Sequence, residues 1–179
     1  MPHPCKLAEV YAAQAKIVRD VETRAAALRR LARVERDKLK RPARAAEAFQ
    51  ALSQLVPDDR EAIDALRTLL ADQRRWQELL DTHRKALALS PEPRAKAQIL
   101  REMAELLRGE LRDPDGALGC FEQSLALEPD DRPTLDQAAD LYSLRRKWTE
   151  FIDVRTRALP HVPPAERPAI HLQIARAAE

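Results

Sequence analysis

The sequence predicts an all-α protein, a right-handed α–α superhelix (a solenoid) of about ten antiparallel helices. Two observations carry this prediction. Prolines punctuate segments whose apolar residues recur at helical spacing, and the chain repeats itself after 72 residues. The 179 residues are 45% hydrophobic, which is enough for a packed core, and include 13 prolines but only 3 glycines. We expect one domain over residues 1–179.

The internal repeat is visible in rare residues. A shift of 72 residues places Phe49 on Phe121 and Trp76 on Trp148. The same shift places the Pro-Asp-Asp-Arg run at 57–60 on an identical run at 129–132. The chain therefore contains two 72-residue double repeats, at about 21–92 and 93–163, with a partial repeat at each end.

Each element of the first double repeat begins and ends at a recognisable signal. Pro42 stands in the first turn of a helix, where its missing N–H costs nothing, and Pro57 ends that helix. Asp58 and Asp59 are candidate N-caps of the next helix. With the partial repeat before them, these signals predict helices at about 6–18, 21–38, 42–55, 60–72 and 76–88.

The second double repeat follows the same scheme. It predicts helices at about 94–111, 115–127, 132–144 and 147–159, and the tail at 165–179 aligns with the start of a third block. A single helical hairpin cannot bury its apolar face alone, so neighbouring hairpins must stack. Because the chain begins and ends in the middle of a repeat, we expect it to be a segment of a longer repeat array.

The helix at 115–127 carries a spaced motif of a small residue, an aromatic residue four positions on, a second small residue and a closing proline. Its members are Ala117, Phe121, Ser124 and Pro129, and the helix at 42–55 matches it with Ala45, Phe49 and Pro57, although Leu52 is large. This motif resembles tetratricopeptide repeats of the bacterial type. The resemblance covers nearly the whole chain and implies a scaffold that holds peptides or partner proteins in a groove, although fold does not fix function.

The alternate hairpins depart from the family pattern. Arg67, Leu79 and Phe151 stand where the family has small residues. We expect these hairpins to pack less closely than the others.

A row of basic residues is the candidate partner-binding site. Residues 1–44 carry a net charge of +7, whereas the remainder carries −5. Within the first part, Arg29, Arg33, Arg36 and Lys40 recur at helical spacing and are expected to share one face. In the family register this face lines the concave groove, and guanidinium groups there favour an acidic peptide, a C-terminal carboxylate or a phosphate.

The alternative is that the basic row pairs with acidic residues of neighbouring helices. Asp64, Asp136 and Asp140 lie at matching positions of the third helix in each block. Exposed ion pairs of this kind contribute only about 0–1 kcal/mol each, and they would cancel much of the field of the row.

The sequence predicts no catalytic, metal or cofactor site. Its glycines cannot form a phosphate-binding loop, and its four histidines lie in no metal-binding spacing. Cys5 and Cys120 are far apart and are expected to be structural. Two tyrosines and a net negative charge after residue 44 disfavour nucleic acid, and no apolar run could cross a membrane.

We therefore expect a protein–protein interaction scaffold rather than an enzyme, located in the cytoplasm, with a partner that the sequence does not name. The alternative is a structural spacer of a larger repeat protein, without a ligand site of its own. The cut repeats also predict weak end-to-end self-association, since their apolar faces lack a polar cap. Its driving residues would be Leu7, Val10 and Tyr11 at one end and Ile170, Leu172 and Ile174 at the other.

Overall fold

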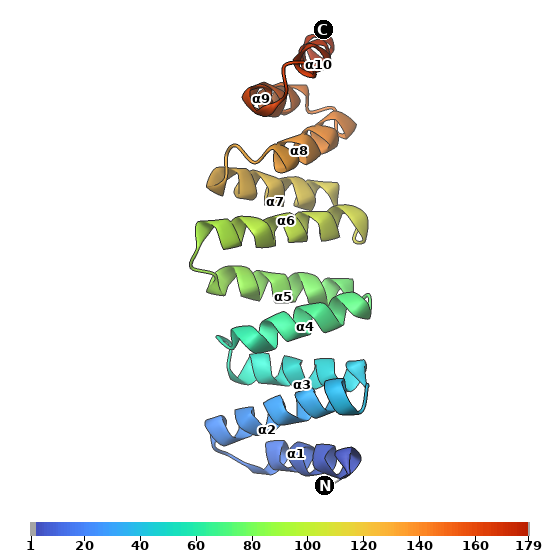
Figure 1. Cartoon of the computed structure of the whole chain (residues 1–179), viewed down its shortest axis with the longest axis vertical. Coiled ribbons are helices and arrows are strands. Elements are labelled where there is room, and N and C mark those ends of the chain that lie inside the picture. Colours follow the sequence, from blue (N-terminus) through green and yellow to red (C-terminus); the bar gives the residue numbers. More distant parts are fainter. Residues whose placement is uncertain (1–2, 179) are drawn as a thin grey trace. The chain divides into compact units, whose positions relative to one another are not determined.

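The computed structural model describes residues 3–178, and within that range the chain forms ten α-helices and no strand (Figure 1). Their bounds are α1 Pro4–Ile17, α2 Val21–Arg33, α3 Pro42–Leu55, α4 Arg60–Asp72, α5 Trp76–Leu89, α6 Pro93–Gly109, α7 Pro114–Leu127, α8 Arg132–Leu144, α9 Trp148–Ala158 and α10 Arg167–Ala177. The all-α prediction is confirmed, and each expected segment is helical. The last residue of the expected tail, Glu179, lies outside the described residues.

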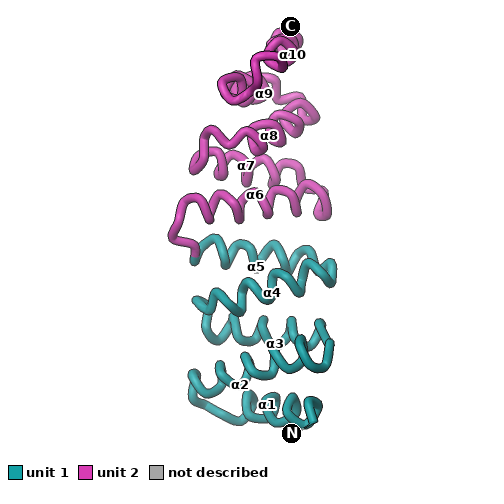
Figure 2. The backbone as a smooth tube through the Cα atoms, viewed as in Figure 1, with its two compact units in different colours: residues 1–89 teal, residues 90–179 magenta. Residues whose placement is uncertain are grey.

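The helices divide into two compact units (Figure 2), residues 1–89 with α1–α5 and residues 90–179 with α6–α10. Each unit consists of antiparallel helices that pack on their neighbours in chain order. The units change over next to the predicted junction of the two double repeats at 92–93. The single domain over residues 1–179 and the right hand of the superhelix stay predictions.

Carboxylate caps fix where the helices begin. Asp59 accepts a hydrogen bond from the backbone N–H of Ala62 at 3.0 Å, as predicted for the N-cap of α4. Asp131 does the same for α8, accepting from the backbone N–H of Thr134 at 3.1 Å. Each cap satisfies one of the backbone donors that a helix start leaves without a partner.

Among residues 3–178, four residues other than glycine adopt the left-handed region, each in a turn that follows a helix, and all four are basic. They are Lys40, Arg74, Arg112 and Arg146, with φ of 53°, 56°, 52° and 56°. The repeat relates them in pairs, since a shift of 72 residues places Lys40 on Arg112 and Arg74 on Arg146. Glycine favours this conformation, whereas a residue with a Cβ atom pays for it.

The core of each unit repeats the same residues. Phe49 is 2% exposed and its repeat counterpart Phe121 is fully buried. Ser124, the small residue of the motif in α7, donates from its hydroxyl to the carbonyl of Ala97 on α6 at 3.2 Å. In the alternate hairpins, Leu79 and Phe151 are each 6% exposed, so these large side chains belong to the core. Whether those hairpins pack less closely stays a prediction.

Helix α2 does not end as a plain α-helix. It continues as a π-helical segment, Val34–Lys38, in which Leu39 donates its N–H to the carbonyl of Val34 at 3.0 Å. The wider turn buries Glu35, which is 4% exposed. A π-turn shifts the register of side chains along a helix, so the face of α2 does not continue unchanged to residue 40.

Among the described residues, no helix combines the length and the apolar character that crossing a membrane requires.

Candidate partner-binding surfaces

Arg29 and Arg33 of the basic row extend from α2 to the start of α4. The guanidinium of Arg29 forms an ion pair with Asp59, and that of Arg33 forms one with Glu61. Burial tends to raise the pKa of Asp59, but the hydrogen bonds from Arg29 and from the backbone of Ala62 outweigh it, so the pKa lies below its ordinary value. Two of the four residues of the row are therefore engaged by acids at the start of α4.

Arg36 and Lys40, the other two members of the basic row, form no ion pair with the described residues of α4. Arg36 donates from Nε to Asp37 at 2.7 Å, and its guanidinium carbon lies 5.6 Å from the ring centroid of Phe49. Lys40 is exposed in its left-handed turn, beyond the end of the helical segment at Lys38. The prediction that all four residues share one helical face is wrong for Lys40, because the chain leaves the helix before reaching it.

The second unit pairs its basic residues in the same way. Arg101 lies 2.6 Å from Glu128 and 3.6 Å from Asp131, the cap of α8. Arg108 lies 2.6 Å from Glu105 on its own helix. In both units, arginines of a first helix thus engage acids at or near the start of the following hairpin.

The acidic partners differ from those that the sequence suggested. Asp64 pairs with Arg67 on its own helix at 3.2 Å. Asp136 and Asp140 both pair with Arg155 of α9, at 2.6 and 3.4 Å. Arginines of the row do pair with acids of another helix, but these acids are Asp59 and Glu61. Spacing along the chain does not show which acid faces which arginine.

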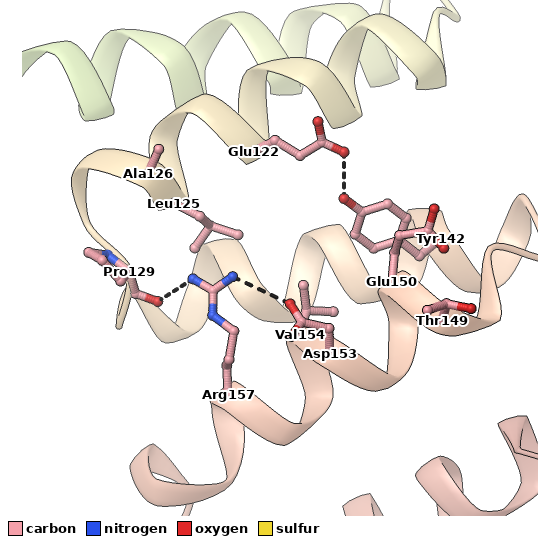
Figure 3. A pocket seen from close by; sticks show the side chains of 10 residues that line it. All are labelled: Glu122, Leu125, Ala126, Pro129, Tyr142, Thr149, Glu150, Asp153, Val154 and Arg157. Atoms are coloured by element: carbon pink, nitrogen blue, oxygen red, sulfur yellow. Dashed lines mark hydrogen bonds and ion pairs between the residues drawn. The ribbon is translucent and has the colours of Figure 1, made fainter.

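A hollow of about 660 Å³ opens in the second unit among α7, α8 and α9 (Figure 3). We call it the acidic pocket. Its lining consists of Glu122, Leu125, Ala126, Pro129, Tyr142, Thr149, Glu150, Asp153, Val154 and Arg157. Three carboxylates and one guanidinium therefore surround an otherwise largely apolar surface.

Tyr142 lines the acidic pocket and forms a hydrogen bond with Glu122, another residue of its lining. The residue is 4% exposed, and its hydroxyl donates to Glu122 at 2.6 Å (Figure 3). Burial raises the pKa of Tyr142, and the hydrogen bond to Glu122 and the charges of Glu150 and Asp153 raise it further. The phenol therefore stays protonated and keeps donating to the carboxylate.

Arg157 offsets part of the negative charge of the acidic pocket. It donates to the backbone carbonyl of Pro129 at 3.0 Å and lies 3.6 Å from the carboxylate of Asp153 (Figure 3). Glu150 forms no ion pair with any residue that the structure describes. Two of the three carboxylates in the pocket, those of Glu122 and Glu150, therefore form no ion pair within the described part of the chain.

Sequence reasoning missed the acidic pocket, although a signal for it was present. The 72-residue shift aligns Tyr142 with Leu70 and Glu122 with Gln50, so the second block is more polar and more acidic at two related positions. That these two positions meet in one hollow follows only from the packing of α7 against α8.

A smaller hollow of about 380 Å³ lies in the first unit between α1, the π-helical segment and the start of α3. Its lining includes Cys5, Glu9, Glu35, Arg41 and Arg44. The Oε2 atom of Glu35 accepts no hydrogen bond, and the nearest cation, Nη1 of Arg41, is 4.0 Å away. Acidic and basic side chains balance here, and within residues 3–178 no three metal-ligating side chains gather anywhere.

Comparison with known proteins bears on the helical hairpins. Residues 62–97, which comprise α4 and α5 and the start of α6, match the family model described as tetratricopeptide repeat. The match falls on an alternate hairpin, the one whose Arg67 and Leu79 depart from the small-residue pattern. No curated protein matches the chain.

Solved structures resemble the chain over most of its length. A crystal structure of MamA is 19% identical with a TM-score of 0.54 and covers 86% of this chain and 85% of its own. PilF of Pseudomonas aeruginosa is 15% identical with a TM-score of 0.53, covering 97% and 85%. A chain of the APC/C hetero-tetramer Cut9-Hcn1 is 17% identical with a TM-score of 0.51, covering 96% of this chain and 35% of its own. At these identities the likeness concerns the fold.

Proposed function

Because this chain is a tetratricopeptide repeat protein, we propose that it is a scaffold that binds a partner protein through the surface of its helical hairpins. The observation that carries the proposal is the repeat match at residues 62–97 together with the same hairpin recurring in both units. Stacked hairpins of this kind offer extended surfaces whose side chains can vary without disturbing the core. One structure with this fold, the Cut9-Hcn1 hetero-tetramer, is itself a complex of different proteins.

The candidate partner surface is the basic row without Lys40, that is Arg29, Arg33 and Arg36. Its ion pair between Arg33 and Glu61 is solvent-exposed, with side chains 49% and 63% accessible. Such pairs contribute only about 0–1 kcal/mol, so a carboxylate of a partner can displace Glu61 at little cost. An acidic peptide is therefore the ligand that we propose for this surface.

A capture experiment tests the scaffold and its location together. The chain is immobilised and exposed to lysate of the source cells, and the captured proteins are identified by mass spectrometry. The test variant carries Arg29→Glu, Arg33→Glu and Arg36→Glu. A matched control carries Arg84→Glu, Arg94→Glu and Arg145→Glu, which reverse three charges outside the row. Circular dichroism confirms equal helicity.

The outcomes separate the alternatives. A partner that the wild type and the control retain, and that the test variant loses, supports the basic row. A partner retained by all three supports the scaffold and rejects the row. If no protein is captured above background, the chain is a spacer of a larger repeat protein, a role that the engagement of Arg29 and Arg33 by their own neighbours also favours. Location in the cytoplasm stays a prediction, which fractionation of the source cells tests.

A further inference from the structure

We propose that the acidic pocket binds an arginine side chain presented by a partner protein. This inference rests on the proposed scaffold function and names the chemistry of one partner contact. It concerns the second unit and is separate from the basic row in the first.

The balance of charge in the pocket favours a cation. Glu122, Glu150 and Asp153 face a single guanidinium, that of Arg157, which already lies 3.6 Å from Asp153 and donates to a backbone carbonyl. Glu150 forms no ion pair among the described residues, and the hydroxyl of Tyr142 directs its proton to Glu122. The guanidinium of a partner arginine could contact Glu150, whose two carboxylate oxygens are both available. It could also contact the oxygen of Glu122 that does not accept from Tyr142.

The internal repeat shows that the fold does not require this charge. In the first unit Glu78 occupies the position of Glu150, and Arg75 holds it with two hydrogen bonds of 2.7 Å each. In the second unit Lys147 replaces Arg75, and no hydrogen bond to Glu150 is formed by the residues described there. The same block that lacks the internal partner also has the acid Glu122.

The first unit neutralises the other acid as well. Asp81, the counterpart of Asp153, pairs with Arg84 at 2.8 Å, whereas Thr156 stands at the position of Arg84 in the second unit. In the second unit Asp153 is paired instead with Arg157, 3.6 Å away. Glu122 and Glu150 form no ion pair among the described residues, so these two acids leave room for an arginine from outside. The difference between two copies of one fold is the reason to infer a ligand here rather than an ordinary solvated surface.

The shape of the pocket suits an arginine side chain. Its volume of about 660 Å³ lies in the range of small-ligand sites, and buried Leu125 and Val154 form part of its wall. An arginine places its methylene stem on such apolar surface and its planar fork on carboxylates, which a lysine ammonium cannot contact in the same two-pronged way. Acidic segments would be repelled by the uncompensated carboxylates.

Titration followed by ¹H–¹⁵N NMR tests the inference with a defined probe, N-acetyl-arginine methylamide. We expect saturable shifts of the backbone amides of Tyr142, Glu150 and Asp153. The corresponding citrulline compound has the same shape without the charge and should leave these amides unchanged.

The double variant Glu150→Gln with Asp153→Asn should weaken binding about tenfold, the loss expected when a charge-assisted hydrogen bond is removed. The matched double variant Glu78→Gln with Asp81→Asn, in the other unit, should bind as the wild type does.

Three results of this titration would each overturn the inference. They are equal shifts with the citrulline compound, shifts spread over acidic residues of both units, and unchanged affinity of the Glu150 and Asp153 variant. Shifts of the same amides that grow with protein concentration, without added probe, would assign the pocket to a second copy of this chain and also overturn it. If the pocket variant still captures the partner found with wild-type protein, the inference fails while the scaffold function stands. If no variant and no wild-type chain captures a protein, the scaffold function fails first.

Discussion

The guanidinium of Arg29 on α2 donates to one oxygen of Asp59, and the other oxygen of Asp59 accepts from the backbone N–H of Ala62 at 3.0 Å. One carboxylate therefore caps α4 and ties it to a helix thirty residues earlier. The second unit repeats the device, since Asp131 caps α8 and lies 3.6 Å from Arg101. Residues that the sequence marked separately, as a basic row and as helix caps, are partners in the structure.

Replacing Asp59 with alanine removes the cap and the partner of Arg29 together. We expect a loss of about 1–2 kcal/mol in the free energy of unfolding, the usual cost of losing a helix cap with a further contact. Urea denaturation measures it. Asp58→Ala is the matched control, because Asp58 is exposed and caps no helix. Equal effects of the two substitutions would contradict the assignment of the cap.

The pH dependence of stability should reveal the same contact. The pKa of Asp59 is lowered in the folded chain, because the hydrogen bonds from Arg29 and Ala62 outweigh burial. Its contribution is therefore present above the pKa of an unfolded aspartate, about 3.9, and is lost as pH falls through the lower folded value. Asp59→Asn keeps a capping side chain without the charge. Melting temperatures of the two proteins should differ above about pH 5 and converge toward pH 2–3. A difference that stays constant over this range would refute the linkage.

The helices could be predicted from sequence because their signals are local. Pro42 and Asp59 mark the starts of α3 and α4, and the 72-residue repeat tests every assignment twice. The π-turn at Val34–Lys38 could not be predicted, since helical periodicity alone does not distinguish it from a continuing α-helix. Helical spacing alone therefore predicts Lys40 on the face of Arg29, whereas in the structure Lys40 lies in a left-handed turn.

The candidate surfaces were harder to predict because they depend on which elements meet. The sequence shows that Arg29 and Arg33 are on one face, but only packing places Asp59 and Glu61 opposite them. The acidic pocket likewise requires Glu122 of α7 to meet Tyr142 of α8. A comparison of the two repeat copies, position by position, is the sequence signal that comes nearest to it.

The left-handed turn residues offer a stabilising substitution. Arg74 has φ of 56° and is exposed, so glycine there relieves strain without removing a core contact. We expect Arg74→Gly to raise the free energy of unfolding by about 0.5–1 kcal/mol, the cost of a left-handed Cβ less the added freedom of the unfolded chain. Arg74→Ala removes the same charge but keeps the Cβ atom and should give no gain. Thermal denaturation compares them, and a gain with alanine equal to that with glycine would show that charge, not strain, is responsible.

The buried carboxylate of Glu35 predicts an asymmetry between two substitutions. Its nearest cation is Arg41 at 4.0 Å, and its Oε2 atom accepts no hydrogen bond. Arg41→Ala should destabilise the chain by about 1–3 kcal/mol, because it leaves a buried charge without a partner. Glu35→Gln removes the charge and leaves Arg41, which is 44% exposed, in contact with water, so stability should be unchanged or higher. Chemical denaturation of both variants decides it, and a larger loss for Glu35→Gln than for Arg41→Ala would contradict this account.

Self-association between the first and last helices is the remaining prediction. Val10 on α1 is 60% exposed and Leu172 on α10 is 52% exposed, so both can contribute, and Ile17 on α1 adds a further side chain at 79%. Ile170 is buried at 7% within its own unit and drops out of the expected contact. Burying two or three such side chains gains about 1.5–3 kcal/mol each, but the loss of translational freedom on association offsets most of this gain. We therefore expect a dissociation constant of about a millimolar.

Sedimentation velocity over a wide concentration range should show the association for the wild type and lose it for Val10→Lys with Leu172→Lys. Leu144→Lys is the control, because Leu144 is 73% exposed on α8, away from both terminal helices in sequence, and its replacement adds the same kind of charge. A chain that stays monomeric at the highest concentration, or a control that abolishes association equally, would reject contact through these ends.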